Sequence, residues 1–215
     1  MLVPSLTKLW AYRMVHYTNV QYILRHGMFT RGHHQQDPDY VFIGDTQLTA
    51  LRHDYPVEIP GGGTLGDYVP FYLWPLTPML LNIKTGWRGI TQRPQRDIVY
   101  VCCAWQALHE TGQRIVFTDG HAKDRISRFY ENEADLDKLD WDTIRDPYWR
   151  NTEEDWDRQR RKQAELLVYQ HVPPTCIGRL VVFDEARRQE MQEIVDAIKL
   201  PILVSVDNKH TFYYR

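Results

Sequence analysis

The chain has 215 residues, of which 43% are hydrophobic and 25% are charged, and its formal net charge is −2. This composition predicts one compact domain, residues 1–215, without disordered tracts, and the near-neutral charge excludes a global cationic field for nucleic acids. Three cysteines without disulfide or metal-ligand spacing, together with an N-terminus that lacks an uninterrupted apolar run, predict a cytoplasmic protein that makes no use of a membrane.

The beginning of the chain predicts a strand followed by a short helix. Residues 11–18 are rich in aromatic and β-branched side chains, which favour a strand, and residues 19–26 place apolar side chains at helical spacing. Gly27 then stands where a glycine often ends a helix.

Three polar residues lie at the end of this predicted strand. Strand alternation puts His16 and Thr18 on the same face. A histidine in a strand is often structural, and that interpretation stays open here. Thr18 and the adjacent Asn19 together offer donors and acceptors in one plane, a pattern that suits a carboxamide ring.

Residues 30–66 mix glycine, proline, aspartate and histidine around one short predicted helix, residues 45–53, with Asp45 as its N-cap. Such a segment predicts a long functional loop or a lid. Arg52, near the end of the helix, is either a solvent-facing residue or a phosphate clamp. The glycine run 61–63 does not open a helix after a strand, so we interpret it as a flexible hinge and not as a phosphate loop.

The same segment contains a group of possible metal ligands, His33, His34, Asp37 and Asp39. Their spacing matches no strong zinc or carboxylate motif, and adjacent histidines point apart in most backbones. We expect an exposed polar loop here and no metal site.

Residues 67–83 have the composition of a strand, but Pro70, Pro75 and Pro78 bar a regular ladder, so we expect an irregular strand that turns at a cleft. Residues 98–103 predict either a strand or the start of an apolar helix.

The middle of the chain continues with residues 115–118, which predict a strand that ends in a turn at Asp119 and Gly120. Residues 121–144 resemble a polar helix followed by a capped turn.

Residues 146–161 are highly charged and aromatic and predict a mobile surface loop. Its aromatics and arginines suit stacking on bases and contacts with phosphates, although a solvated helix with core tryptophans explains the same residues. Glu165 follows at the start of an apolar segment. It is either a solvated acid on the outer face of a strand or an acid aimed into a cleft.

The C-terminal part predicts a strand at 178–184, an amphipathic helix at 184–199 capped by Asp184, and a hairpin around Asp207 and Asn208. Strands and helices are intermixed along the whole chain. The predicted class is therefore α+β with a central mixed or antiparallel sheet.

Nearly the whole chain resembles the DarT family, bacterial toxins that ADP-ribosylate DNA. The resemblance rests on six stretches in the family's order: YRMVHYTNVQYILRHGM, LR at 51 and 52, GGGTLGDYVPFYLWPLTPML, IVFTDGHA, LDWDTI and RKQAELLVY. It implies an ADP-ribosyltransferase-like split mixed β-sheet with flanking helices around an NAD cleft. Residues 30–66 then become an NAD-covering lid, and residues 146–161 a substrate-facing loop.

The resemblance also implies a role for individual positions. The implied residues are Glu165 and Arg52 for catalysis, His16, Thr18, Asn19, Gly27, Arg52 and Tyr72 for NAD binding, and His121, Trp149 and Arg158 for nucleic-acid binding. NAD is expected as the co-substrate, without a metal.

The implied reaction is NAD-dependent ADP-ribosylation of a base in single-stranded DNA, thymine in the first place, with release of nicotinamide. The chain would act as the toxin of a toxin–antitoxin system whose antitoxin is a macrodomain protein. Three alternatives stay open from the sequence: a guanine-targeting enzyme, a non-catalytic single-stranded nucleic-acid-binding module, and a metal-dependent nuclease that uses His33 and His34.

Overall fold

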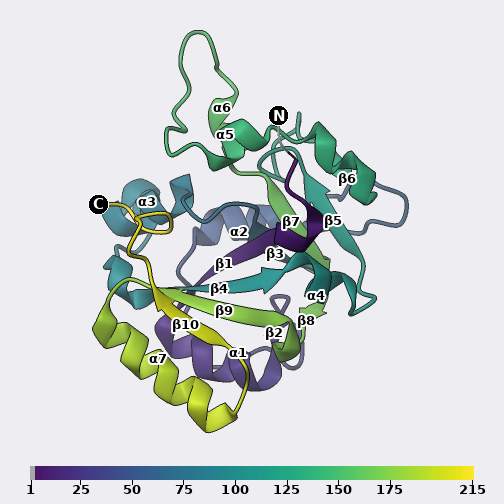
Figure 1. Ribbon diagram of the computed structural model, residues 1–215. Helices are drawn as coiled ribbons and strands as arrows, with labels where there is room; N and C mark the ends of the chain where they lie inside the picture. Colours follow the sequence, from purple (N-terminus) through teal and green to yellow (C-terminus); the bar gives the residue numbers. More distant parts are fainter. Residues whose placement is uncertain (1–2) are drawn as a thin grey trace.

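A mixed sheet of eight strands organises residues 3–215, the part of the chain that the computed structural model describes (Figure 1). The strand order is β10-β9-β4-β1-β3-β7-β5-β6, and neighbours are antiparallel except for β9 and β10, which run parallel. The sheet strands are β1 (Trp10–His16), β3 (Tyr68–Tyr72), β4 (Ile98–Ala104), β5 (Ile115–Thr118), β6 (Phe129–Tyr130), β7 (Glu165–Tyr169), β9 (Ile177–Val182) and β10 (Leu203–Val206). Two short strands, β2 (Met28–Phe29) and β8 (His171–Val172), pair separately.

Helices flank this sheet, and α7 packs against α1 beside β9 and β10 (Figure 1). The α-helices are α1 (Val20–His26), α2 (Thr46–His53), α3 (Pro78–Thr85), α4 (Trp105–His109), α5 (Trp141–Arg145), α6 (Arg158–Lys162) and α7 (Glu185–Ile198). Within residues 3–215, none of the helices combines the length and the apolar character needed to cross a bilayer.

The sheet is split along the seam between β1 and β3. β1 pairs with β4 over its full length, from Trp10 to His16, whereas Tyr12 and Tyr72 form the single register pair between β1 and β3 in the described chain. One further bond crosses the seam, from Arg13 Nη1 to the carbonyl oxygen of Pro70 at 2.7 Å. The two strands therefore diverge beside this contact and leave room for a cleft inside the sheet.

Burial explains why several elements were predictable. Residues 98–103 form a strand because every side chain from Ile98 to Cys103 is buried on one face or the other of the sheet. In α7, the Asp184 carboxylate accepts a hydrogen bond from the Arg187 amide at 2.9 Å, which confirms the predicted N-cap. Met191 and Val195 are buried on the predicted apolar face, and each such burial contributes on the order of 2 kcal/mol.

Two predictions for residues 67–144 are wrong in part. The strand after Tyr68 ends at Tyr72, and Pro78 begins α3 because a proline without an N–H is well suited to the first turn of a helix. Residues 121–144 contain no long polar helix. They form turns, β6, a 3₁₀ helix at Glu133–Lys138 and α5.

The predicted hairpin around Asp207 and Asn208 is also wrong. β10 runs parallel to β9, and no strand follows it in the described chain. The Asp207 carboxylate instead accepts hydrogen bonds from the amides of Thr211, Phe212 and Tyr213 at 2.8–3.1 Å. This carboxylate folds the chain back, so that Tyr213 is buried against the sheet.

The glycine run 61–63 was predicted to be a flexible hinge, but hydrogen bonds hold its backbone in place. The Val57 amide bonds to the Gly63 carbonyl oxygen, the Tyr68 hydroxyl donates to the Gly62 carbonyl oxygen, and Arg114 Nη1 donates to the Gly61 carbonyl oxygen, at 2.6–3.0 Å. All three carbonyl groups of the run are therefore occupied.

Lys162 is an unusual residue at the base of the loop that joins α5 to α6. Its side chain is buried, and its ammonium donates to the carbonyl oxygens of Ile144 at 2.7 Å and Asp146 at 2.8 Å. Burial lowers the pKa of Lys162 to about 7, against the smaller opposing effect of Asp146. The lysine thus holds the start of the loop at an electrostatic cost.

We expect this cost to appear in the pH dependence of stability. Because the pKa of Lys162 is lower in the folded state, the unfolded chain binds more protons between pH 7 and about 10, and the free energy of unfolding rises with pH there by up to about 1.4 kcal/mol per unit. Lys162→Met removes this contribution, whereas Lys8→Met, at an exposed lysine, retains it. Urea unfolding at pH 7, 8 and 9 measures the slopes, and identical slopes in all three proteins would contradict the expectation.

Candidate active site

Glu165 is a buried acid at the point where β7 begins. Its side chain is 4% exposed, and its backbone pairs with Tyr72 of β3 across the ladder. Its amide donates to Thr118 Oγ1 at 3.1 Å, and that hydroxyl donates to the Gly120 carbonyl oxygen at 2.6 Å. The acid is therefore not on the solvated face of a strand but is fixed inside the molecule beside the turn that ends β5.

The Glu165 carboxylate is held by a bidentate ion pair with Arg52. Arg52 Nη1 lies 2.8 Å from Oε1 and Nη2 lies 2.6 Å from Oε2, and the Ala122 amide also donates to Oε1 at 2.9 Å. A carboxylate has about four lone-pair sites. Three of them are filled here, so one remains on Oε2.

The pair also fixes the ionisation of its members. Burial on its own would raise the pKa of Glu165, but the charge and hydrogen bonds of Arg52, together with the hydrogen bond from the Ala122 amide, bring this pKa below its ordinary value. Burial would lower the pKa of Arg52, and Glu165 reverses this and raises it. Burial lowers the pKa of His121, so its ring is neutral at pH 7. The resulting site contains an ionised acid, a permanent cation and a neutral imidazole.

Arg52 reaches the acid because the 30–66 segment is folded over the sheet. The Asp45 carboxylate caps α2 by accepting from the Leu48 amide at 2.8 Å, and Arg52 lies in the last turn of this helix. The Asn19 side chain fixes the segment further upstream. Its amide nitrogen donates to the Val41 carbonyl oxygen, and its amide oxygen accepts from the Val41 amide, both at 2.9 Å.

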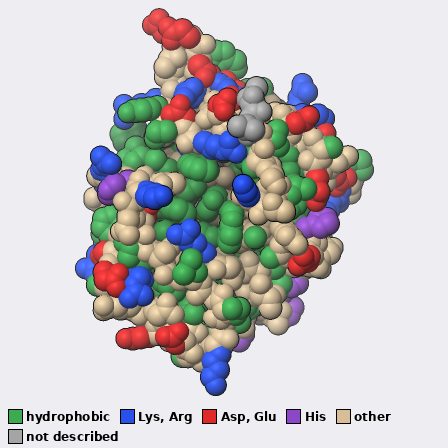
Figure 2. All heavy atoms as spheres, in the orientation of Figure 1, with side chains coloured by type: hydrophobic (Ala, Val, Ile, Leu, Met, Phe, Trp, Pro, Cys, Tyr) green, Lys and Arg blue, Asp and Glu red, His purple; other side chains and the backbone are tan. Residues whose placement is uncertain are grey.

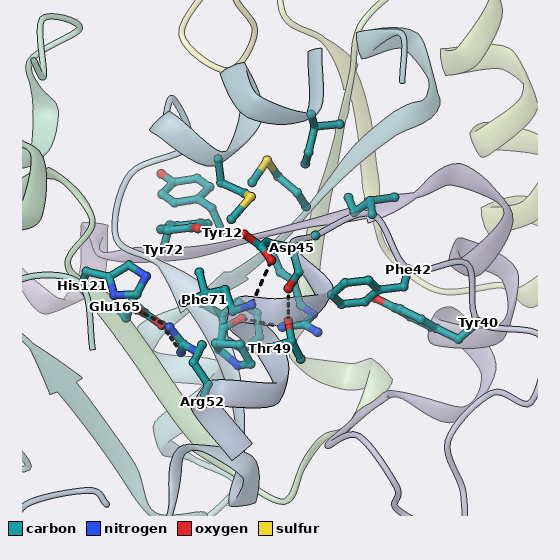
Figure 3. Close-up of a pocket in the computed structure, with 18 residues that line it drawn as sticks. Tyr12, Tyr40, Phe42, Asp45, Thr49, Arg52, Phe71, Tyr72, His121 and Glu165 are labelled. Carbon is teal, nitrogen blue, oxygen red and sulfur yellow. Dashed lines mark hydrogen bonds and ion pairs between the residues drawn. The ribbon is translucent and has the colours of Figure 1, made fainter. Parts of the chain in front are cut away.

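A cleft opens from the ion pair along the seam of the sheet (Figure 3). Figure 3 shows Arg52, Glu165 and His121 together at one end, and Tyr40 and Phe42 at the other. The walls come from β1, the 30–66 segment, β3, α3 and the two residues His121 and Glu165. The free volume is about 150 Å³, which is below the roughly 300–1,000 Å³ typical of ligand pockets.

Several lining residues were not predicted from the sequence. Tyr12 lies on β1 where the strand meets Tyr72, and Tyr40 and Phe42 come from the 30–66 segment. The stretch of aromatic and aliphatic residues 40–43 inside a polar segment is the signal that would have indicated an inward-facing wall. Tyr12 had no comparable signal. The predicted strand 11–18 has a tyrosine on each face, Tyr12 on one and Tyr17 on the other, so the sequence does not indicate which one faces a cleft.

The remaining predicted NAD-binding residues lie outside the lining of this cleft. His16 ends β1, Thr18 and Asn19 follow it, and Gly27 comes directly after α1, beside β8. His16 Nδ1 and Thr18 Oγ1 are 2.7 Å apart, and Asn19 makes the contacts with Val41 described above. Gly27 has a φ of 94°, and a Cβ at this position would lie 2.4 Å from the Val172 carbonyl oxygen. Each residue thus has a structural contact of its own, and their part in NAD binding stays a prediction.

Of the predicted nucleic-acid-binding residues, His121 lines the cleft, Trp149 belongs to the loop between α5 and α6, and Arg158 is the first residue of α6. Arg158 is engaged within that loop, since Nη2 lies 2.5 Å from Asp146 Oδ2 and Nε donates to the Tyr148 carbonyl oxygen at 2.7 Å. Figure 2 shows acidic side chains at the top of the molecule, where Figure 1 places this loop.

The histidine pair of the 30–66 segment forms an aromatic stack. The rings of His33 and His34 are stacked with centroids 4.4 Å apart, contrary to the expectation that they point apart, and Phe29 stacks on His33. Across residues 3–215, no three His, Cys, Asp or Glu side chains are grouped so that they could hold a metal ion.

Comparison with known proteins gives a consistent family assignment. A family model described as ssDNA thymidine ADP-ribosyltransferase, DarT, matches residues 12–214. A DNA ADP-ribosyl transferase of Escherichia coli O127:H6 is 31% identical over 213 residues, which is 99% of this chain and 96% of the relative.

Two solved structures of DarT from Thermus sp. 2.9 are also similar. The complex with ADP-ribosylated ssDNA has a TM-score of 0.87 at 31% identity and covers 98% of both chains. The complex with NAD+ has a TM-score of 0.81, also at 31% identity, and covers 98% of this chain and 99% of that one.

The ion pair predicts a pH effect in the variant Arg52→Gln. Without the guanidinium, burial raises the pKa of Glu165 above the unfolded value of about 4.3, so the folded protein binds the extra proton and its free energy of unfolding falls as the pH rises from 5 to 7. The unaltered chain, in which this pKa is lowered, loses the contribution of Glu165 only when the pH drops below about 4. We expect a loss of about 3–5 kcal/mol at pH 7.

Urea unfolding at pH 5, 6 and 7 measures this difference. Arg25→Gln, at an exposed arginine of α1, provides the matched control and should behave like the unaltered chain. A loss in Arg52→Gln that is the same at all three pH values would rule out the expected change in the ionisation of Glu165.

Proposed function

The chain belongs to the DarT family of single-stranded DNA thymidine ADP-ribosyltransferases, and on this premise we propose that it transfers ADP-ribose from NAD to a thymine base of single-stranded DNA and releases nicotinamide. The observation that carries the proposal is the buried, ionised Glu165 fixed at one end of the cleft in the split sheet. The family description names thymidine, which supports thymine over the alternative of guanine.

The donor set at the cleft fits NAD as a co-substrate. NAD supplies an ADP-ribosyl group whose bond to nicotinamide breaks with a build-up of positive charge on the ribose. Glu165 offers a fixed negative charge to this ribose, and the free lone-pair site on Oε2 is available to one ribose hydroxyl while Arg52 stays in place. Tyr72 and Tyr12 provide aromatic surface beside the same carboxylate for the nicotinamide ring.

Glu165 acts mainly through its charge. In the transfer, the bond from the ribose C1′ to the nicotinamide nitrogen breaks and neutral nicotinamide leaves, a bond from C1′ to a nitrogen of the base forms, and the proton of that nitrogen passes to solvent water. A carboxylate that is ionised before the reaction stabilises the positive ribose in the transition state without reorganisation. The pKa of Glu165, which Arg52 holds low, favours this role over strong general-base catalysis.

Arg52 positions other groups through its positive charge and its hydrogen bonds, and it does not act as a base. Its guanidinium is always protonated in proteins, and here its pKa is raised further by Glu165. The fork that holds both oxygens of Glu165 fixes the direction of the carboxylate. The same fork suits a phosphate or a base oxygen if it rotates away from Oε2.

We further propose that residues 30–66 act as a lid. The cleft has only about 150 Å³ of free volume, and this segment supplies Tyr40 and Phe42 to its wall. A dinucleotide can enter only if the lid moves outward, and its return would bring Arg52 back to Glu165. We also propose that His16, Thr18, Asn19 and Gly27 contact NAD, as the family resemblance implies.

The biological setting is also part of the proposal. DNA and NAD are both found in the cytoplasm, where the chain would act as a toxin. Covalent modification of DNA bases requires a means of reversal in the producing cell, and a macrodomain antitoxin that removes the ADP-ribose meets this need. The loop from 146 to 161 would face the DNA. Its acidic and basic side chains nearly balance, so the loop itself does not repel DNA even though the whole chain has a net charge of −2.

Incubation with NAD and single-stranded oligonucleotides tests the activity. We expect an ADP-ribose adduct on thymidine-containing strands, seen by mass spectrometry, with equimolar release of nicotinamide. Glu165→Gln should lower the rate by at least about a hundredfold, since it removes a charge that acts in the transition state. Glu131→Gln, at an exposed acid that pairs with Arg114, should leave the rate unchanged.

Three results would count against the proposal. They are the absence of any adduct on DNA while NAD stays intact, an adduct only on strands without thymidine, and equal activity of Glu165→Gln and the unaltered chain. Circular dichroism of each variant at the assay temperature checks that the loss of activity is not a loss of folding.

Arg52→Lys separates charge from geometry. Lysine retains the positive charge but cannot reach both oxygens of Glu165 through a planar fork, so we expect the turnover rate to fall at least about tenfold with the fold retained. Single-turnover assays at saturating NAD measure it. Turnover within twofold of the unaltered chain would show that the bidentate geometry does not matter.

A further inference from the structure

A second hollow lies beside the candidate active site, between α3 and the loop that joins α5 to α6. Its lining includes Leu81 of α3, Tyr148, Trp149 and Arg150 of the loop, and Tyr214. It shares no lining residue with the cleft within the described chain, and its free volume is about 560 Å³. We call it the α3 groove.

Helix α3 is the common wall of the two hollows. Met79 and Ile83 line the cleft, and Leu81 lines the α3 groove. An α-helix with its side chains is about 10 Å wide. The α3 groove is therefore within reach of a nucleotide that lies a few positions from a base in the cleft.

Tyr148 is presented to this groove on a fixed backbone. Its amide donates to Asp146 Oδ1 at 2.8 Å, and its carbonyl oxygen accepts from Arg158 Nε at 2.7 Å. The residue is nevertheless 81% exposed. A large ring that is exposed while both of its backbone groups are held is organised in advance for a contact from outside, which reduces the entropy lost on binding.

The neighbouring aromatic, Trp149, is held from the other side of the groove. Its indole N–H donates to the Tyr214 hydroxyl oxygen at 2.9 Å, and that hydroxyl donates to the Thr77 carbonyl oxygen at 2.9 Å. Thr77 immediately precedes α3. Two aromatic side chains of the groove, Trp149 and Tyr214, are thus linked by hydrogen bonds to the start of α3, the helix that the groove shares with the cleft.

The charges around the groove favour a base over a phosphate. Arg158 is paired with Asp146 and Asp155. Arg150 is an exposed cation of the lining, but the same loop also exposes Glu153 and Glu154. These charges nearly cancel, so attraction of the DNA backbone is weak here. Stacking on aromatic rings does not depend on net charge and accepts any base.

We infer that the α3 groove binds one unstacked nucleobase that flanks the modified thymidine, with Tyr148 as its stacking surface. This inference rests on the proposed function for the identity of the strand. It adds a second point of contact, so that the strand is held at two positions when the target base reaches Glu165.

Binding of short oligonucleotides tests the inference without requiring turnover. Each strand has one thymidine and carries an abasic residue at one flanking position, and fluorescence anisotropy measures its Kd. We expect one flanking position at which loss of the base weakens binding between about fivefold and a hundredfold, the range for one base stacked on an aromatic ring. In Tyr148→Ala the intact strand should be weakened by the same factor, and the abasic residue should then have no further effect.

Trp156→Ala is the matched control, because Trp156 lies on the same loop and is 69% exposed but does not line the groove. The inference is overturned if no flanking position matters, if Tyr148→Ala remains sensitive to the abasic residue, or if Trp156→Ala reproduces the effect. It is also overturned if Tyr148→Ala binds DNA normally but loses self-association in sedimentation, which would assign the groove to a second copy of the chain. The adduct assay is independent of these measurements, so a missing adduct would count against the proposed function alone.

Discussion

The bidentate contact between Arg52 and Glu165 joins two parts of the chain that are 113 positions apart in sequence. One partner is carried by a helix of the 30–66 segment and the other by a central strand of the sheet. The contact keeps a buried carboxylate ionised, which burial alone would oppose. It also joins the 30–66 segment to the sheet, so the ionisation of this acid and the position of the segment depend on the same pair of side chains.

A second set of contacts connects α6 and the loop before it to this acid. Arg160 of α6 lies 2.9 Å from Asp119, and its carbonyl oxygen accepts from the His121 amide at 3.0 Å. These contacts hold the turn at residues 119–122. The same turn contains Ala122, whose amide donates to Glu165. Displacement of α6 would therefore be transmitted to the carboxylate through one short turn, and DNA that contacts the loop has a direct physical route to the reacting centre.

Much of the architecture was predictable because the local sequence patterns and the burial of side chains favour the same helices and strands. The capped amphipathic helix α7 follows from periodicity, and Asp45 marks the start of α2. The apolar run that forms β4 was compatible with a strand and with a helix, and the structure decides for the strand. The family resemblance identified the ADP-ribosyltransferase fold and its NAD-dependent reaction, both of which the comparisons bear out. Sequence patterns failed where one specific side-chain contact decides the path of the chain. The Asp207 carboxylate replaces a hairpin by binding three amides, and the arginines of the loop pair with aspartates that are distant or on the next turn.

The seam between β1 and β3 has a consequence for recognition. An ordinary sheet has unpaired backbone groups only at its outer edges, where they invite pairing with other chains and aggregation. Here the strands part after Tyr12 of β1 and before Tyr72 of β3, so two strand edges face each other across the cleft inside the protein. Main-chain groups that face this seam lie inside the protein, and no side-chain mutation can remove them. The pairing capacity of an edge strand is thereby kept where it cannot join other chains.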